Sequence, residues 1–270
     1  MLHEKAIYIL EGRTYFVEKY DHQERRAQVR EAEVDYYTDA ITHTKVRILD
    51  RFEEQAVASA RRRHGEVHVT SQVVGFKKIK FWTNENVGSG ELQMPENEMH
   101  TTAYWLTVPR EVMAALAVGG AERRDGVVAL SYTLGQLAAL FVMCDRHDLG
   151  VALGDNGQGE ARIERGLRRL GLAGHDRPSP GDDYEPHIFI YDAYPGGIGL
   201  SEPLYRLHER LLAEGQALIA ACPCRDGCPS CVGPVGEVGS RGKQVALAIL
   251  GAIHGTDNHR GTETQRDHVT

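Results

Sequence analysis

The sequence lacks any apolar stretch long enough to cross a membrane. No window approaches the roughly 18 consecutive apolar residues that identify a spanning helix. The opening residues, MLHEKAIYILEGRTYF, also lack the basic flank and long apolar run of a secretory leader. These absences predict a cytoplasmic protein with no membrane partner. At 270 residues and 41% hydrophobic, the chain is long enough to fold around a core of its own.

The sequence has fewer basic than acidic residues, 31 against 38. The formal net charge of −7 at pH 7 opposes broad attraction to phosphate, because such binding depends on many lysine and arginine contacts. Contact with single-stranded DNA is therefore expected to be local or supplied by a partner. Two short basic groups are candidates for it: Arg61, Arg62 and Arg63, and then Arg162, Arg165, Arg168 and Arg169.

Cysteine is scarce outside one segment. Four of the five cysteines fall within ten residues, at Cys222, Cys224, Cys228 and Cys231, so they cannot join distant parts of the chain as a secreted disulfide framework would. A reducing compartment and a metal are more consistent with this distribution. The fifth, Cys144, ends an apolar segment and is expected to be a small buried apolar side chain.

The four clustered cysteines are spaced as C-x-C-x3-C-x2-C, and thiolates at such spacing suit tetrahedral zinc. Gly227 permits a positive φ where the loop turns back, and Pro223 and Pro229 stiffen the turns. Partly buried thiols, local disulfides and iron–sulfur ligation remain as alternatives. A redox role is less favoured, because the C-x2-C pair does not follow a strand at the start of a helix.

The order of sequence patterns predicts an α+β fold. Short alternating runs over residues 6–37, and again over 66–76 and 77–82, are typical of antiparallel strands, with Arg61, Arg62, Arg63 and His64 in a charged connection. We expect an N-terminal, mostly antiparallel β subdomain over residues 1–108. A helix-rich subdomain with the four-cysteine zinc site is predicted over 109–256, followed by a disordered tail over 257–270.

Within the second subdomain, apolar spacing predicts a helix near residues 110–118 and a buried central helix over 125–144. A Gly-, Asp- and Pro-rich excursion over 154–186 includes a short helical piece near 163–170, and residues 187–194 are expected to form a buried strand. Ser201 is the predicted N-cap of the helix that leads to the cysteines. The last helix is predicted over 242–254.

Two further motifs, CDRHDLG and YDAYPGGIG, place acidic residues where buried elements end. Asp145, His147, Asp148 and Asp192 have the chemistry of a metal or acid–base site, but aspartates at such positions more commonly cap loop N–H groups. The glycines of the second motif suggest a phosphate-binding turn: Gly196, Gly197 and Gly199. The turn lacks the third spaced glycine, because position 202 is glutamate.

A nucleotide-binding loop is also suggested by Gly239, Gly242 and Lys243. The pattern fails, because residue 237 is glutamate where glycine is needed and residue 244 is glutamine where a hydroxyl must hold magnesium. No ATPase motor is therefore predicted in this chain, and it is not expected to be an enzyme alone.

Several motifs in one order together resemble the C-terminal zinc-binding domain of the mitomycin repair factor A (MrfA) helicase family: GRTYFVEKYD, VDYYT, TTAYWLTVP, MCDRHDLG, YDAYPGGIGL and CPCRDGCPSC. The resemblance extends over about residues 3–252. It implies a domain that follows two RecA-like motor domains, zinc bound by the four cysteines, translocation on single-stranded DNA and a role in DNA repair. After Cys231 the sequence VGPVGEVGSRGKQ departs from the cysteine- or asparagine-containing loop expected of relatives.

Three functions are consistent with these patterns. The first is a non-catalytic zinc-binding accessory domain or subunit of a DNA-repair-type superfamily 2 helicase, which assists DNA engagement by a RecA-like motor. The second is a small metal-dependent hydrolase built on Asp145, His147, Asp148 and Asp192. The third is a structural adaptor in a defence complex.

Overall fold

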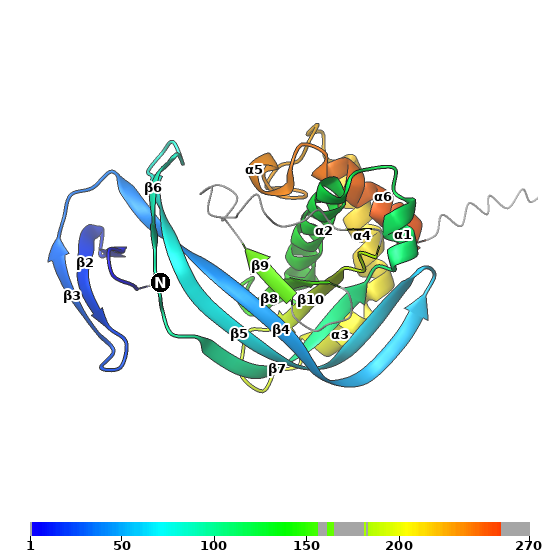
Figure 1. The fold of residues 1–270 in the computed structure, drawn as a ribbon, viewed down its shortest axis with the longest axis horizontal. Coiled ribbons are helices and arrows are strands. Elements are labelled where there is room, and N and C mark those ends of the chain that lie inside the picture. Colours follow the sequence, from blue (N-terminus) through cyan, green and yellow to red (C-terminus); the bar gives the residue numbers. More distant parts are fainter. Residues whose placement is uncertain (1, 156–160, 165–180, 182, 255–270) are drawn as a thin grey trace, which may run out of the picture.

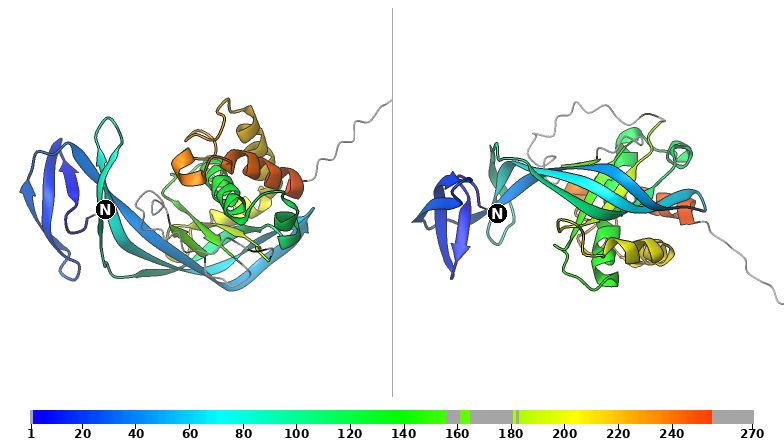
Figure 2. Two further views of the ribbon diagram at one scale, coloured as in Figure 1. Left: turned by 45° about the horizontal axis from the view of Figure 1, so that its top comes forward. Right: turned by 90° about the horizontal axis from the view of Figure 1, so that it is seen from below.

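A computed structural model describes residues 2–155, 161–164, 181 and 183–254 (Figure 1). A small antiparallel sheet at one end contains β1 (Ile7–Leu10), β2 (Arg13–Asp21) and β3 (Arg26–Glu31), in that order. In both Figure 1 and Figure 2, this small sheet and the helices lie on opposite sides of β6. Val17 of β2 is fully buried, as the predicted alternation requires.

The larger sheet is built on one long hairpin of β4 (Tyr36–Val57) and β5 (Ala60–Lys80), which runs beneath the helices in Figure 1. Two predictions were wrong here. The basic run after residue 60 is part of β5, not a connection, and β5 continues unbroken where two strands were expected. Register shifts within the hairpin bend its two strands around the core. The charged residues of the basic run remain paired in the sheet.

The other strands of this sheet come from later in the chain: β6 (Asn86–Glu91), β7 (Asn97–Thr107), β8 (Leu149–Gly154), β9 (Ala161–Glu164) and β10 (His187–Asp192). The order is β8-β10-β7-β5-β4-β9, with β6 paired to β5, and every pairing is antiparallel. The sheet therefore crosses the predicted boundary at residue 108, because β10 pairs directly with β7. A short helix was expected near 163–170. The first two of these residues belong to β9 instead, and the others lie outside the described residues.

Six helices are described: α1 (Arg110–Ala115), α2 (Gly120–Phe141), α3 (Ser201–Arg206), α4 (His208–Ala221), α5 (Val235–Val238) and α6 (Gly242–His254). The predicted helix after Ser201 is divided at Leu207, between α3 and α4. Ser201 does not act as an N-cap; the cap position is Leu200, and the Ser201 hydroxyl bonds to side chains of the sheet instead. The α+β prediction is confirmed.

The main core lies between the helices and one face of the sheet. Tyr104, Leu106 and Ile188 face the helices, and α2 contributes Leu130 and Leu134 to the same cluster. Alternate residues of the same strands form a second cluster on the other face, where Trp105 and Phe189 stack with their centroids 5.6 Å apart.

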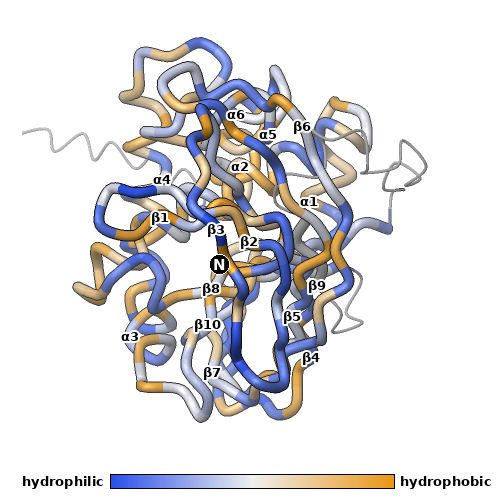
Figure 3. The backbone as a smooth tube through the Cα atoms, turned by 90° about the vertical axis from the view of Figure 1, so that its left-hand side faces the viewer, coloured by the Kyte–Doolittle hydropathy of each residue, from blue (hydrophilic) through white to orange (hydrophobic). Residues whose placement is uncertain are grey.

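Figure 3 views the molecule from the small-sheet side, with hydrophilic and hydrophobic segments alternating along the chain. Among the described residues, no helix has the length and apolar character needed to span a membrane. The predicted disordered tail over 257–270 lies outside the described residues.

Candidate metal centre

The four clustered cysteines lie in the loop between α4 and α5, directly above the main core. Cys222 is the C-cap residue of α4, and Cys231 is buried at 1% exposure. Cys224 and Cys228 are half-buried and pack against the same apolar cluster. A metal bound here would therefore join the end of a helix to the core.

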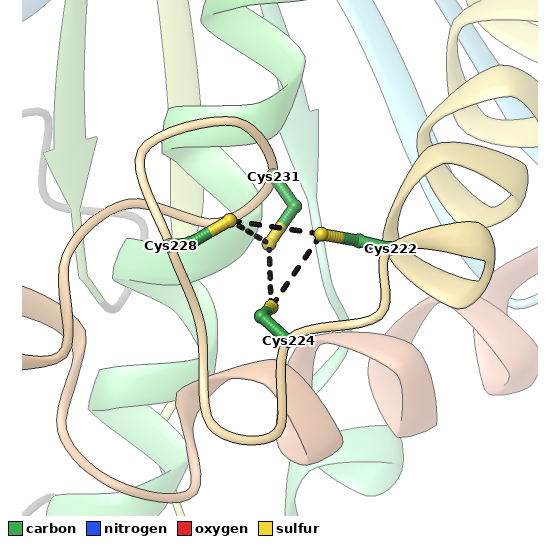
Figure 4. A group of neighbouring side chains, drawn as sticks. All are labelled: Cys222, Cys224, Cys228 and Cys231. Carbon is green, nitrogen blue, oxygen red and sulfur yellow. Dashed lines mark hydrogen bonds between the residues drawn. The ribbon is translucent and has the colours of Figure 1, made fainter.

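The Sγ atoms point toward one another (Figure 4). Around the ring of cysteines 222, 224, 231 and 228, successive Sγ–Sγ distances are 3.5, 3.4, 3.7 and 3.6 Å, and all four atoms lie within 4.8 Å of one another. Four sulfurs on a tetrahedron about 2.3 Å from a zinc ion are about 3.8 Å apart. The sulfurs are therefore already placed at the separations of a single tetrahedral ion.

The same Sγ–Sγ distances argue against disulfides and against an iron–sulfur cluster. A disulfide requires sulfurs about 2.05 Å apart, and these cysteines are all free. A multi-iron cluster distributes its thiolates over different irons, which spreads the sulfurs more widely than one shared ion does. The observed group is compact, so its donor set suits one thiophilic ion with four ligands and no open position.

The loop backbone supports this geometry. Gly227 has φ of +138°, as predicted, and a Cβ there would approach Val232 Cγ2 to 2.8 Å. A hydrogen bond from the Ser230 N–H lowers the pKa of Cys228 to about 7, whereas burial raises the pKa of Cys231 to about 12. Metal ligands must be thiolates, so a bound cation would offset the burial that disfavours the ionised form of Cys231.

Helix α2 fixes the second pair of cysteines. Thr133 Oγ1 donates to the Cys231 carbonyl at 3.1 Å, and Tyr132 Oη donates to the Pro229 carbonyl at 2.8 Å. Both contacts connect residues nearly a hundred positions apart in the chain. They anchor the C-x2-C turn to the central helix.

Helix α6 fixes the first pair. Lys243 Nζ donates to the carbonyls of Cys222 at 2.7 Å and Cys224 at 2.6 Å, and it lies 3.5 Å from Cys224 Sγ. Its side chain is buried at 7% exposure. Gln244 Nε2 donates to the Arg225 carbonyl at 3.1 Å in the same loop. A buried ammonium here offsets the negative charge that four thiolates leave around a divalent ion.

Sequence reasoning missed the role of Lys243, which it considered only as a failed nucleotide-binding lysine. The structure explains the failure, because Gly239 follows helix α5, Gly242 and Lys243 begin helix α6, and no strand leads into them. A nucleotide-binding loop connects a strand to a helix. The usable signal was a lysine at the start of an apolar helix just after a cysteine cluster.

The CDRHDLG motif forms an exposed turn of mutual caps. Asp145 Oδ1 accepts from the His147 backbone N–H at 2.8 Å and lies 2.7 Å from His147 Nδ1. Asp148 accepts from the Asp145 N–H at 2.9 Å and from the Tyr194 hydroxyl at 2.6 Å. The backbone N–H of His147 lowers the pKa of Asp145 further than its imidazole does.

Asp192 pairs with Leu149 beside that turn, but it is fully buried and its carboxylate is directed to the glycine turn. Its Oδ2 accepts the N–H groups of Ile198, Gly199 and Leu200 at 2.7, 2.9 and 3.1 Å, so it caps the glycine turn. Gly196, Gly197 and Gly199 all have positive φ. Among the described residues, the cysteines are the only group whose ligand atoms converge within metal-binding range, so the carboxylates and the imidazole of the four acid–base candidates do not form such a group.

The predicted DNA-contacting arginines differ in accessibility. Arg61 is exposed, and Arg62 stacks over the Tyr205 ring at 4.8 Å. Arg63 is buried, where it pairs with Glu54 at 2.9 Å and donates to Thr107 Oγ1 at 2.6 Å. Its guanidinium therefore contacts β4 on one side and β7 on the other, within the sheet. In the other basic group, Arg162 belongs to β9, and Arg165, Arg168 and Arg169 lie outside the described residues.

Comparison with known families matches residues 130–232 to the MrfA Zn-binding domain, a span that contains all four clustered cysteines. The resemblance inferred from the motifs is confirmed, and so is the prediction of a zinc-binding domain. The structure described above supplies a four-cysteine group suited to that metal.

The helicases that the chain is similar to are much longer than it is. ATP-dependent helicase YprA of Bacillus subtilis is 35% identical over 250 residues, which are 93% of this chain and 30% of that protein. ATP-dependent helicase HRQ1 of Saccharomyces cerevisiae is 23% identical over 86% of this chain and 20% of its own length. A crystal structure of the DUF1998 helicase MrfA bound to DNA is 34% identical, covers 93% of this chain and 30% of that one, and has a TM-score of 0.58.

Proposed function

We propose that this chain is a non-catalytic zinc-binding accessory domain or subunit of a DNA-repair-type superfamily 2 helicase. In this proposal Cys222, Cys224, Cys228 and Cys231 are the zinc ligands, and the domain assists a RecA-like motor in engaging single-stranded DNA. The single observation that carries it is the closed ring of four sulfurs, held from both sides by helices of a domain that matches part of known helicases.

Zinc in a closed four-thiolate site is structural, because no coordination position is left for water or substrate. The chain's own residues determine what such an ion would join. Thr133 connects the second cysteine pair to α2, Lys243 connects the first pair to α6, and Cys222 continues directly from α4. Loading the site would therefore fix the ends of three helices above the sheet.

Support for a non-motor role comes from Lys243. In a nucleotide-binding loop this lysine would reach the phosphates, but here it is buried against two cysteine carbonyls. The matched region also covers a minor part of each helicase relative, which leaves most of their length, where ATP hydrolysis is expected, outside the similarity. The accessory function thus requires a motor from the same or another polypeptide.

The test combines zinc analysis with a helicase assay. The purified protein should contain about one zinc per chain and little iron, and it should raise the DNA affinity or unwinding rate of a RecA-like motor from this family. DNA titrations at two salt concentrations, with chain and motor alone and together, measure the contribution. We expect weak binding by the chain alone, because its net charge of −7 opposes contact with phosphate.

Three outcomes would overturn parts of this proposal. Tight, salt-resistant DNA binding by the isolated chain would contradict an accessory role. No gain in the motor's DNA affinity or unwinding would leave the structural adaptor as the remaining function. Fresh, reduced protein without metal would remove the zinc site.

A further inference from the structure

A second candidate site lies where the glycine turn meets the bent end of the β4–β5 hairpin. An open cavity of about 420 Å³ is lined by Phe52, Glu53, His64, Thr102 and Glu202, together with the glycines of the turn. This volume is within the range of about 300–1,000 Å³ that small-molecule and side-chain ligands occupy. None of the clustered cysteines lines it, so the cavity is separate from the metal centre.

The walls of this cavity are fixed by the fold. Glu53 and His64 are cross-strand partners in the hairpin, and Asp192 holds the glycine turn through three backbone N–H groups. At Gly196 and Gly199 an added Cβ would meet no atom within 4 Å, so these positions leave open space in the turn that lines the cavity. The positive φ at both positions maintains that backbone shape.

The Nδ1 atom of His64 is a hydrogen-bond acceptor that no donor group satisfies among the described residues. The residue is 7% exposed, and its Nδ1 has no hydrogen-bond partner among the described residues. Ser201 Oγ donates to Thr102 Oγ1 at 2.9 Å, so it accepts from His64 Nε2 at 3.3 Å, and Nδ1 keeps its lone pair. Burial lowers the pKa of His64, despite the opposing effect of nearby Glu53, so the ring is neutral at pH 7.

Glu53 provides a second acceptor at a distance that a shared donor would bridge. Its Oε1 lies 3.9 Å from His64 Nδ1, beyond hydrogen-bond range. A nitrogen about 2.9 Å from each atom would satisfy both. Leaving a buried polar atom such as Nδ1 unpaired costs on the order of 1–3 kcal/mol, which a ligand with N–H donors would recover.

The remaining groups favour a planar cation. Glu202 adds a second carboxylate, partly offset by its contact with Arg206, and Asp192 adds a buried negative charge behind the turn. Phe52 is 53% exposed and packs edge to face against His64 at 5.5 Å between centroids, which leaves an aromatic surface available. Carboxylate acceptors beside an aromatic ring recognise a guanidinium, whose rigid fork donates several hydrogen bonds while its plane stacks.

From this arrangement we infer that the cavity binds the guanidinium of an arginine side chain presented by a protein partner. A metal ion is a poorer occupant, because these donors do not converge to the mutual distances found among the cysteines. Nucleic acid is also disfavoured, since the carboxylates repel phosphate. The inference does not rest on the proposed helicase function.

The test uses the full zinc-loaded chain and the blocked tripeptide acetyl-Gly-Arg-Gly-amide as probe. Amide shifts of Gly196 and Gly199 in two-dimensional NMR should saturate with a dissociation constant of about 1 mM, which corresponds to about −4 kcal/mol. The matched lysine peptide should bind several-fold more weakly, because it lacks the planar fork. The neutral citrulline peptide should not bind.

Substitutions of residues that line the cavity test whether the arginine peptide binds there. Glu53→Gln and Phe52→Ala should each weaken binding of the arginine peptide about tenfold, equivalent to about 1.4 kcal/mol. The matched controls are Glu31→Gln, an exposed glutamate of the small sheet, and Leu49→Ala, an exposed apolar residue of β4; both should bind normally. Thermal unfolding of each variant shows whether it is folded, and Phe52→Ala retains the test if the Glu53 variant is not.

Several outcomes would overturn the inference: no saturable shift with the arginine peptide, equal binding of the citrulline peptide, or undiminished binding in both cavity variants. A thymidine oligonucleotide that moves the same amides while the arginine peptide does not would assign the cavity to nucleic acid instead. Zinc content and motor stimulation are measured on the same variants. Loss of zinc or of motor stimulation would contradict the proposed function. If both are retained, a failure of peptide binding contradicts only the inference about the cavity.

Discussion

Lys243 Nζ donates to the carbonyl oxygen of Cys224 at 2.6 Å and lies 3.5 Å from its Sγ, although nineteen positions separate the two residues. The contact connects the first turn of α6 to the cysteine loop and puts a positive charge beside the metal centre. Cysteine spacing provides the ligands, whereas the position of α6 provides charge compensation.

Replacing Lys243 with methionine should weaken zinc retention about 10- to 100-fold, the usual cost of removing a group that supports metal ligands. Methionine keeps the apolar length but provides no ammonium for the Cys222 and Cys224 carbonyls. The rate of zinc transfer to a chromogenic chelator measures the effect. Lys19→Met, at an exposed position of β2, is the control, and equal transfer rates for both variants would contradict the role of Lys243.

Cys228→Ser should lower stability, because metal binding energy at a structural site is largely folding energy. With free zinc about 1,000-fold above the dissociation constant, the loss is about 4 kcal/mol. Thermal unfolding with and without a chelator measures it. Cys144→Ser is the matched control, since that thiol is outside the cluster; unchanged unfolding of Cys228→Ser would show that the site is not structural.

The isolated chain should hydrolyse no ATP, with or without single-stranded DNA. Lys243 is engaged with two carbonyls of the cysteine loop, and the glycines before it follow a helix rather than a strand. A phosphate-release assay tests this expectation. Turnover that Lys243→Ala abolishes would show that this segment binds nucleotide after all.

Stability should fall in mild acid. Burial lowers the pKa of His187 and of His208 from 6.5 to about 4 in the folded chain. The unfolded chain therefore takes up protons first, so the stabilisation is complete above about pH 6.5 and is lost as pH falls through about 4. At about pH 5 the loss is roughly 2 kcal/mol for each histidine.

Urea unfolding at about pH 7 and about pH 5 measures this loss. His187→Asn should reduce the difference between the two midpoints, whereas His147→Asn, at an 83% exposed side chain, should leave it unchanged. Comparing variants removes any shared effect of acid on the metal site. Identical pH dependence in wild type and His187→Asn would contradict the assignment.

Arg63→Ala should destabilise the fold by about 1–3 kcal/mol, because it leaves Thr107 and Glu54 without a buried charged partner. Arg61→Ala, at the exposed position two residues earlier, should cost little stability. Urea unfolding and DNA titration in the presence of the motor separate the two effects. If Arg63→Ala lowers DNA affinity at unchanged stability, Arg63 contacts DNA despite its burial.

The elements that were predicted well are those whose signal is local. The last helix was placed at 242–254 and is observed as Gly242–His254, because apolar residues recur there at helical spacing. The strand expected over 187–194 is observed as His187–Asp192. The long hairpin was missed because the end of β4 is charged and exposed and β5 has three arginines near its start, so hydrophobic alternation is weak there.

The candidate sites divide in the same way. The sequence by itself determined the metal centre, since all four ligands lie within ten residues and two prolines and a glycine restrict the turns between them. Only the tertiary structure decided that Lys243 and Thr133 support that centre, that Arg63 is buried, and that Glu53 and His64 face the glycine turn across a common cavity. The physical reason is that these contacts depend on how helices pack on a bent sheet, which no short stretch of sequence encodes.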